Sequence, residues 1–311
     1  MTVKRVAVIL WAVALSAAGQ ACAADEPGDY KTITVDGEER EYYVHLPAGY
    51  DAATPAPLVL GLHGGGGTAE AFDKLSHLNA TADAHGFIAV YPQGLGKAWN
   101  DGRAINKLKK KADDVKFFGE LCKRLASDYA VDERRIYVTG ISNGGFMSMR
   151  LAAEMPDVFA AACSVAAGVS DFLAEEHEPP LAPVPVMLIN GTDDPLVPYE
   201  GGDVKVLGFK RGKVLAADEG VGWWAKHNGC EVPPAKKDLP DVDPTDGTTV
   251  WREDYRNAGG ADAVLVTVEG GGHTWPSGWQ YLGEGLIGKT TKDIDNEIIW
   301  EFFAAHPREA D

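Results

Sequence analysis

The segment 140–144, Gly-Ile-Ser-Asn-Gly, places a serine between glycines in the pattern Gly-x-Ser-x-Gly. An apolar run at 136–139 precedes this segment, and residues 145–154 have the composition of a helix. A serine on a tight turn from a strand to a helix stands clear of the sheet edge, and the glycines let the backbone pass without a Cβ clash. The pattern therefore predicts that the hydroxyl of Ser142 attacks an acyl carbon.

A base and a carboxylate that could activate this serine lie further along the chain. His273 and Asp194 each come directly after an apolar run that predicts a strand. A serine hydroxyl is a poor nucleophile at neutral pH, so it needs a base, and the base needs a carboxylate to orient it. Because the carboxyl ends of parallel strands meet at one sheet edge, we expect these side chains to converge. The order Ser, Asp, His is that of α/β-hydrolases, with Asp193 as an alternative acid.

Donors for the negative charge that develops on an attacked carbonyl oxygen can come from the backbone. Four glycines at 64–67 follow an early apolar run and can supply one N–H, and the amide of Asn143 can supply the second. We assign the first donor to Gly65, with Gly64 and Gly66 as alternatives. No Gly-Lys-Ser/Thr follows the glycines, which argues against a phosphate-binding loop of the Walker type.

Three tryptophans in predicted loops, Trp99, Trp275 and Trp279, are candidates for substrate contact. Each could stack on an aromatic or sugar group, or pack within the fold instead. The histidines and cysteines lack the spacing of metal ligands, and the chemistry above needs neither a metal nor an organic cofactor. Cys122, Cys163 and Cys230 could form one disulfide, and its pairing stays open. Cys163 lies in an apolar run typical of a buried strand, which favours a core position for it.

The elements that must position these residues alternate between strands and helices. Strands are expected at 31–35, 40–46, 57–62, 87–91, 135–140, 160–165, 184–190 and 263–268, and helices at 69–84, 114–129, 145–154, 218–227 and 295–305. Continuously apolar strands separated by helices predict an α/β-hydrolase fold, a mostly parallel central sheet with helices on both faces. Two stretches rich in proline and acidic residues, 173–185 and 231–249, are interpreted as surface excursions within one catalytic domain, 24–311.

The first 23 residues have the pattern of a secretory signal peptide. Lys4 and Arg5 precede an apolar run that is too short to cross a bilayer, and small residues then offer a cleavage site at Ala21-Cys22-Ala23. Acylation of Cys22, as in a lipoprotein, is the alternative, but Gln20 stands where a small residue is expected. A secreted chain without a membrane span is therefore predicted.

The charge of the chain limits its partners. The formal net charge is −17, and residues 1–23 hold two of the 29 basic and none of the 46 acidic residues, so the mature chain carries −19. Such a surface repels nucleic acids, anionic lipids and polyanionic substrates such as pectin. The expected partner is a small or oligomeric ester, and the oligomeric state is left open.

Several motifs of the chain occur together in one known family. They are 62–66 (Leu-His-Gly-Gly-Gly), 91–94 (Tyr-Pro-Gln-Gly), 99–101 (Trp-Asn-Asp), 113–115 (Asp-Asp-Val), 140–145, 191–199 and 271–276. With them the chain resembles the polyhydroxybutyrate depolymerase/feruloyl esterase family over nearly all of its length after residue 23. The resemblance implies a serine esterase in which Ser142 is the nucleophile and His273 the base, and it favours Asp194, in Gly-Thr-x-Asp, as the acid.

The acid and alcohol of the ester stay open at this point. Secreted polyester depolymerases of the family usually add an adsorption domain, which this sequence lacks, so soluble esters, oligomers or side-chain esters on plant polysaccharides fit better. A serine peptidase of the same fold, and a non-catalytic protein that keeps the pocket, are the alternative hypotheses.

Overall fold

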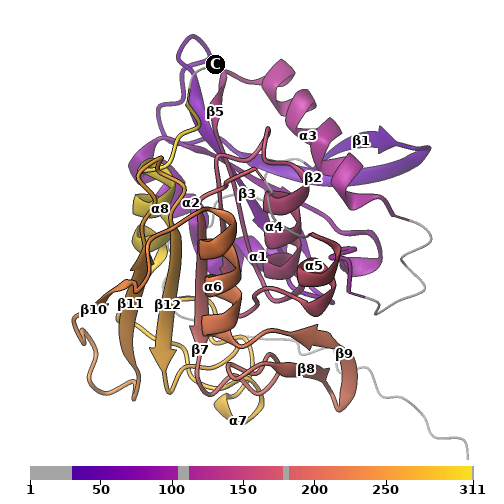
Figure 1. The fold of residues 1–311 in the computed structure, drawn as a ribbon. Coiled ribbons are helices and arrows are strands. Elements are labelled where there is room, and N and C mark those ends of the chain that lie inside the picture. Colours follow the sequence, from indigo (N-terminus) through magenta and orange to yellow (C-terminus); the bar gives the residue numbers. More distant parts are fainter. Residues whose placement is uncertain (1–29, 104–111, 178–181, 310–311) are drawn as a thin grey trace, which may run out of the picture.

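The computed structural model describes residues 30–103, 112–177 and 182–309. Ten strands form one sheet in the order β1-β2-β4-β3-β5-β6-β7-β12-β11-β10 (Figure 1). They are β1 (Lys31–Val35), β2 (Glu38–His45), β3 (Ala56–Leu62), β4 (Ile88–Pro92), β5 (Val131–Ile141), β6 (Ala161–Val165), β7 (Val186–Gly191), β10 (Ala235–Asp238), β11 (Thr249–Tyr255) and β12 (Ala263–Glu269). A separate hairpin consists of β8 (Gly202–Val206) and β9 (Phe209–Val214). The predicted signal peptide, 1–23, lies outside the described residues.

The centre of the sheet is parallel. The pairs β4–β3, β3–β5, β5–β6, β6–β7 and β7–β12 are all parallel, whereas the outer pairs at both edges are antiparallel. The inner strands β3, β4, β6 and β7 are buried at every residue, because helices cover both of their faces. This arrangement confirms the predicted α/β-hydrolase fold.

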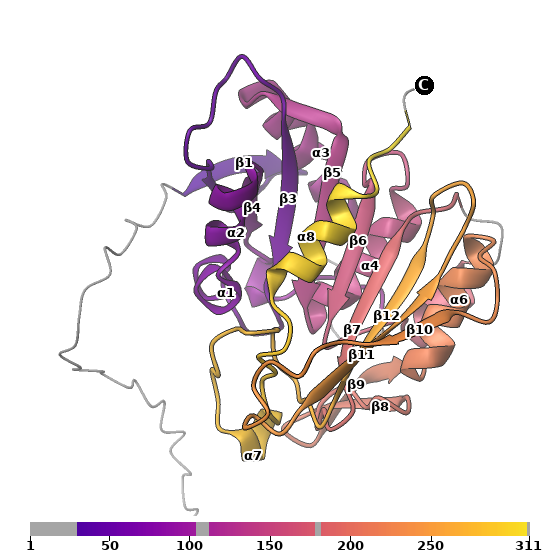
Figure 2. The same ribbon diagram turned by 90° about the vertical axis from the view of Figure 1, so that its left-hand side faces the viewer.

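Helices form a layer on each face of the sheet (Figures 1 and 2). They are α1 (Ala69–Ser76), α2 (Leu78–His85), α3 (Asp114–Asp128), α4 (Asn143–Glu154), α5 (Asp171–Glu176), α6 (Ala217–His227), α7 (Glu284–Ile287) and α8 (Asn296–Ala304), with a 3₁₀ turn, η1 (Leu95–Lys97). One apolar core joins α3, α4 and α6 to the sheet, and a second joins α1, α2 and α8 to the other face. No helix among the described residues has the length and apolar character needed to cross a bilayer.

The predicted helix 69–84 is wrong as one element, because α1 and α2 are separated at His77. This residue takes a left-handed conformation, with φ 54°. The last carbonyls of α1 bond to distant groups and do not continue the helix: Leu75 O accepts from Trp279 N at 3.2 Å, and Ser76 O accepts from Asn296 Nδ2 at 2.8 Å. Long-range contacts, which no local pattern reveals, therefore set this break.

The predicted surface excursions contain regular structure. Residues 173–185 overlap α5, and 231–249 contain β10, whose four residues are all exposed. The hairpin β8–β9 and strand β11 were not predicted as strands. β11 extends the sheet beyond β12, and β8–β9 follows the loop that carries Asp194.

Candidate active site

Ser142 occupies a strained turn between β5 and α4. It is the one residue between the end of the strand at Ile141 and the start of the helix at Asn143, and its backbone has φ 57° and ψ −121°. Its N–H donates to Val165 O at 2.9 Å, which ties the turn to the neighbouring strand. A non-glycine residue held in such a conformation costs on the order of 1–3 kcal/mol and is commonly found at functional sites.

The glycines on both sides of Ser142 allow α4 to pack closely on the sheet. A Cβ at Gly144 would lie 2.3 Å from Leu62 O, and a Cβ at Gly140 would lie 2.8 Å from the Leu62 Cβ. Both distances are well below van der Waals contact, so any larger residue would displace the start of the helix. The close approach explains why the elbow needs glycine at these positions.

Replacing Gly144 with alanine is expected to destabilise the fold by about 3 kcal/mol and to lower kcat about 100-fold, because the helix start and Ser142 must shift. The control is Gly222→Ala in α6, where an added Cβ meets nothing within 4 Å. That variant should gain about 0.5–1 kcal/mol from helix propensity. Urea unfolding and steady-state rates on an aryl ester measure both effects, and equal stability of the two variants would contradict the packing argument.

His273 and Asp194 are hydrogen-bonded to each other. Nδ1 of His273 lies 2.7 Å from Oδ2 of Asp194, and both side chains are almost completely buried. The other carboxylate oxygen, Oδ1, accepts from the N–H groups of Leu196 at 2.8 Å and Val197 at 2.9 Å. The carboxylate is therefore fixed by the backbone on one side and fixes the imidazole on the other.

The alternative acid, Asp193, does not contact the histidine. Its side chain is exposed, and its Oδ1 accepts from the hydroxyl of the adjacent Thr192 at 3.4 Å. The geometry therefore brings together His273 and Asp194, the pair that the sequence favoured.

Ser142 and His273 line the same pocket. The hydrogen bonds of the described residues include none between these two side chains. Contacts between a nucleophile and its base often tighten only when a substrate binds. All three side chains thus lie at the carboxyl ends of β5, β7 and β12, the edge that the sequence predicted.

Two backbone N–H groups of the glycine loop, residues 64–67, donate to no acceptor among the described residues. The N–H of Gly67 donates to Gly64 O at 3.0 Å and that of Gly66 to Lys97 O at 2.7 Å, whereas no hydrogen bond within residues 30–103, 112–177 and 182–309 uses the N–H of Gly64 or Gly65. This leaves Gly65 and Gly64 as possible oxyanion donors and removes Gly66. Asn143 is the first residue of α4, so its N–H has no intrahelical acceptor.

His63 holds the glycine loop in place as a buried, neutral imidazole. Its Nε2 accepts from Gly94 N at 3.0 Å, so the proton is on Nδ1, which donates to Gly64 O at 2.8 Å. Burial lowers the pKa of this histidine because it disfavours the cation. His63 is one of the residues whose role sequence reasoning missed, although it precedes the glycine run directly.

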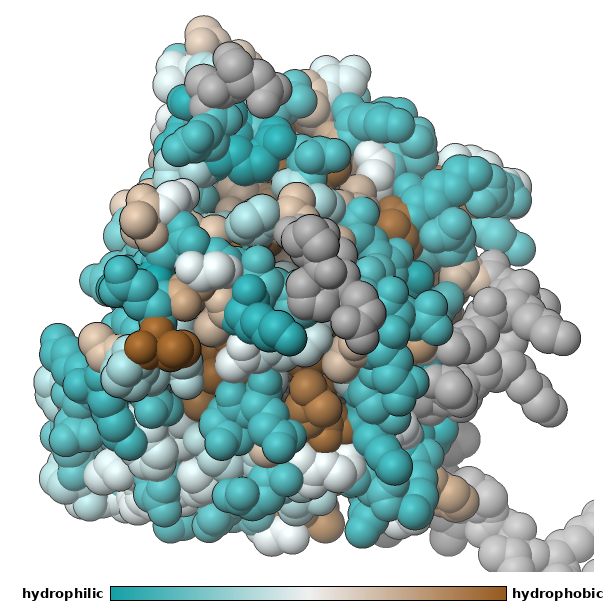
Figure 3. Space-filling view, viewed as in Figure 1, coloured by the Kyte–Doolittle hydropathy of each residue, from teal (hydrophilic) through white to brown (hydrophobic). Residues whose placement is uncertain are grey.

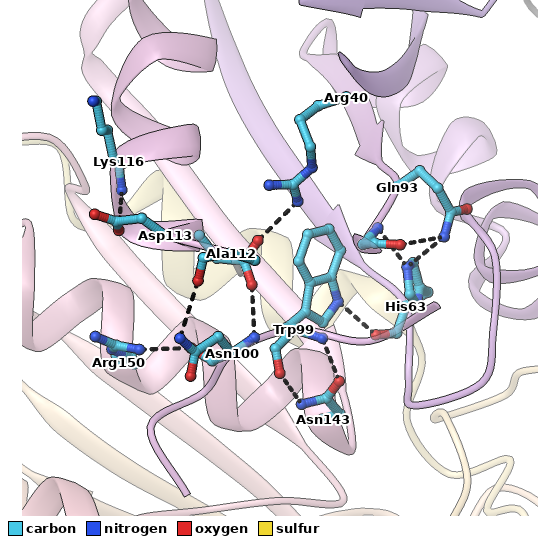
Figure 4. A network of polar contacts seen from close by, with 12 residues as sticks. Arg40, His63, Gln93, Trp99, Asn100, Ala112, Asp113, Lys116, Asn143 and Arg150 are labelled. Carbon is cyan, nitrogen blue, oxygen red and sulfur yellow. Dashed lines mark hydrogen bonds and ion pairs between the residues drawn. The ribbon is translucent and has the colours of Figure 1, made fainter. Parts of the chain in front are cut away.

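The side chain of Asn143 is a second contact that the sequence did not predict. Its Oδ1 accepts from Trp99 N at 2.7 Å, and its Nδ2 donates to Trp99 O at 3.0 Å and Asp101 Oδ2 at 2.6 Å. Trp99 Nε1 in turn donates to His63 O at 2.9 Å. Figure 4 shows Trp99 joined in this way to both His63 and Asn143, so one loop connects the two backbone segments that carry the oxyanion donors.

A buried ion pair holds this loop in place. Arg40 donates to Asp114 Oδ1 at 2.8 Å, and Oδ2 of the same carboxylate accepts from Asn100 N at 2.6 Å (Figure 4). Arg150 donates to Asn100 O at 2.6 Å from α4. The motifs 99–101 and 113–115 therefore form one network that positions the loop.

The pocket above Ser142 has a volume of about 660 Å³, the size of a site for a drug-sized molecule. Its walls are mostly apolar and include Phe72, Leu75, Leu196, Val204, Tyr281, Leu282 and Ile287. Trp99 and Trp279 line it, the first almost buried and the second 61% exposed. The prediction for Trp275 as a substrate contact is wrong: this side chain is fully buried, packs on Phe72 and donates to Asn296 Oδ1 at 2.8 Å.

The described cysteines are separate thiols. Cys122 and Cys163 are buried, and burial raises the pKa of each thiol to about 12, while Cys230 is half-buried. The expected disulfide among these three is therefore not formed. Within the described ranges, no three His, Cys, Asp or Glu side chains gather as metal ligands would.

Comparisons with known proteins point to esterases. The model of the prolyl oligopeptidase family matches residues 73–182. The putative esterase NocK of Nocardia uniformis subsp. tsuyamanensis is 34% identical over 280 residues, which cover 87% of this chain and 80% of that protein. Feruloyl esterase B of Piromyces equi is 31% identical over 78% of this chain and 45% of that protein. Poly(3-hydroxyalkanoate) depolymerase C of Paucimonas lemoignei is 35% identical over 41% of this chain and 31% of that protein.

A solved structure shares the fold. The acetyl xylan esterase from Aspergillus awamori superposes with a TM-score of 0.58, covering 89% of this chain and 100% of that chain at 17% sequence identity. At this identity the likeness concerns the fold alone.

Proposed function

Because this chain belongs to the esterase family that includes the feruloyl esterases and polyhydroxyalkanoate depolymerases, and is a carboxylic ester hydrolase, we propose that it works through an acyl-enzyme on Ser142. The observation that carries the proposal is the hydrogen bond between His273 and Asp194 in a pocket shared with the strained Ser142. Acyl transfer needs this combination of a nucleophile, a base and an orienting carboxylate.

In the first step, the Ser142 hydroxyl attacks the ester carbonyl carbon while Nε2 of His273 takes its proton. Asp194 keeps the other proton of the imidazole on Nδ1, at 2.7 Å, and stabilises the imidazolium that forms. His273 then gives its proton to the alcohol that leaves. In the second step, a water molecule deprotonated by the same Nε2 attacks the acyl carbon, the bond to Ser142 Oγ breaks, and His273 returns the proton to this oxygen as the acid is released.

The negative charge on the carbonyl oxygen would be held by the N–H groups of Gly65 and Asn143. Neither N–H has an acceptor in the part of the chain that the structure describes, and a Cβ at Gly65 would lie only 3.6 Å from the Asn143 Cβ, so the two residues face each other closely. The hydrogen bonds of His63 and Trp99 hold the glycine loop and the start of α4, which carry these two N–H groups, in fixed positions. Donors fixed in advance cost no reorganisation during the reaction.

The substrates that fit best have a sizeable acyl group. A mostly apolar pocket of about 660 Å³ is larger than an acetyl group needs, and it suits an aromatic acyl group such as a feruloyl side-chain ester of a plant polysaccharide. Short 3-hydroxybutyrate oligomers are a second candidate, which the similarity to the poly(3-hydroxyalkanoate) depolymerase supports.

We expect hydrolysis of methyl ferulate and of short 3-hydroxybutyrate oligomers, slower release from acetylated xylan, and no cleavage of a peptide amide. A Ser142→Ala blank removes background, and mass spectrometry after an acid quench should find the acyl group on the peptide that contains Ser142. Serine-dependent cleavage of the amide at a comparable rate would favour the peptidase alternative. Failure of a fluorophosphonate to label Ser142 would favour the non-catalytic alternative.

The place of action is also part of the proposal. The pattern of residues 1–23 supports export with removal of this segment. The intact mass of the protein recovered outside the cytoplasm tests this, since a chain that keeps residues 1–23 or carries lipid on Cys22 would contradict simple cleavage.

A further inference from the structure

The pocket carries a charge opposite to that of the chain. Four charged side chains besides histidine line it: Lys97, Asp101, Arg103 and Arg211. Asp101 and Arg103 form a buried ion pair at 2.5 Å and neutralise each other. Two positive charges therefore remain in the pocket of a protein whose net charge is −17.

Neither of the remaining cations has a carboxylate partner within the described ranges. No ion pair among the described residues includes Lys97 or Arg211, whereas Arg40, Arg124, Arg135, Arg150, Arg252 and Arg256 are all paired with Asp or Glu. Lys97 is exposed and Arg211 is half-buried at the pocket, and no described carboxylate neutralises either charge. Cations placed in this way are available to a ligand.

Both cations are attached to the oxyanion machinery through their own backbone. Lys97 has φ 62°, an uncommon conformation for a non-glycine residue, and its carbonyl accepts from Gly66 in the glycine loop. The carbonyl of Arg211 accepts from Arg103, whose partner Asp101 contacts the Asn143 side chain. The backbone of each residue is therefore fixed beside the segments that carry the proposed oxyanion donors, and its side chain extends from there to the pocket.

The hairpin β8–β9 extends this positive region. Residues 202–214 carry Lys205, Lys210, Arg211 and Lys213 against a single acidic residue, Asp203. Figure 1 shows the hairpin below α6 at the lower end of the molecule, and its residues Val204, Val206 and Arg211 line the pocket. The face viewed in Figure 3 is mostly hydrophilic, with small separate apolar areas. The positive charge that attracts an anion toward the pocket would therefore come from this hairpin, because the rest of the chain is acidic and repels anions.

We propose that Lys97 and Arg211 are specificity residues that bind a carboxylate on the substrate, so that the enzyme prefers esters with one negative charge. This inference rests on the proposed ester hydrolysis. A carboxylate gains from a cation in an apolar pocket, and the guanidinium of Arg211 can hold it with two parallel hydrogen bonds. The acidic surface beyond the pocket still disfavours polyanions, which limits the preferred substrate to a small ester with a single charge.

Matched pairs of esters test the proposal. For a charge on the acid side, mono(4-nitrophenyl) adipate is compared with the 4-nitrophenyl ester of adipic acid monoamide. For a charge on the alcohol side, 3-butanoyloxybutanoate is compared with its amide. We expect kcat/KM to be at least about tenfold higher for the anion in one pair, as one charged hydrogen-bonded contact would give.

Two variants test whether the preference for the anionic ester depends on the two cations that line the pocket. Arg211→Gln should reduce the ratio of anion to amide about tenfold, and Lys97→Gln should reduce it further in the double variant. The matched control is Lys205→Gln, which removes the same charge from the same hairpin but not from the pocket lining. This control should keep the ratio within about twofold at physiological ionic strength, because salt screens an exposed charge that lies outside the pocket.

The results separate this proposal from the proposed function. Equal kcat/KM for anion and amide in both pairs, or a preference that survives the double variant, would overturn it. If neither ester is cleaved, the proposed hydrolysis fails, and calorimetry on the Ser142→Ala variant then compares binding of adipate, taken as its monoamide with one carboxylate, with adipamide. Tighter binding of adipate that is lost with Arg211→Gln supports the site, and equal binding refutes it.

Discussion

Replacing Ser142 with alanine is expected to lower kcat on an aryl ester by on the order of 10⁴ to 10⁶. The nucleophile is lost, while binding and the oxyanion donors remain. Alanine has the same backbone limits as serine, so the turn at φ 57° should persist and stability should change little. Burst and steady-state kinetics, with thermal unfolding in parallel, give both quantities.

A matched control for this variant is Ser148→Ala, six residues further along the chain in α4. Its hydroxyl donates to Gly144 O at 2.9 Å and does not line the pocket. Most of the activity should remain in this control. If Ser142→Ala retains activity of the same order, Ser142 is not the nucleophile and the proposed acyl-enzyme is wrong.

Replacing Asp194 with asparagine is expected to lower kcat about 10⁴-fold through the tautomer of His273. Oδ1 accepts from the N–H groups of Leu196 and Val197, so an amide at this position must keep its oxygen there. Its NH₂ group then faces Nδ1 of His273, which must accept and not donate. The proton moves to Nε2, where the base is needed, and the histidine can no longer take the serine proton.

Asp193→Asn serves as the control for this substitution, because it makes the same chemical change at the adjacent exposed residue. It should alter kcat less than about threefold, as most surface substitutions do. The pH profile of kcat/KM distinguishes a lost base from a merely looser fold. Should Asp193→Asn prove the more damaging of the two, the acid is assigned to the wrong residue.

The sequence was sufficient for the parts of the site that depend on local patterns. The elbow at Ser142, the loops of Asp194 and His273 and the glycine run all follow buried strands, and the parallel sheet brings them to one edge. The succession of strands and helices decides that these residues meet at one sheet edge, and this succession can be inferred from the apolar runs in the sequence. Helix α4 begins at Asn143, two residues earlier than predicted, because the turn consists of Ser142 alone.

Features set by contacts between distant segments could not be predicted. Trp275 lies in a motif beside His273, yet it turns into the core to meet Phe72 and Asn296. The break at His77 depends on Trp279 and Asn296, which are about 200 residues away. The hairpin β8–β9 has mostly exposed residues, so it gives no strong apolar pattern although it supplies part of the pocket wall.

The position of the glycine loop, residues 64–67, depends on pH because the loop is held by a neutral His63. Burial lowers its pKa, so below about pH 6.5 the unfolded chain takes up a proton that the folded chain refuses. The stability that His63 provides is therefore complete above this pH and declines as the solution becomes more acidic. Once the ring is protonated, Nε2 can no longer accept from Gly94, and the hydrogen bond that keeps His63 and residues 64–67 in place is lost. Acid is expected in this way to lower activity by releasing the loop that carries a proposed oxyanion donor, although His63 takes no part in the proposed proton transfers.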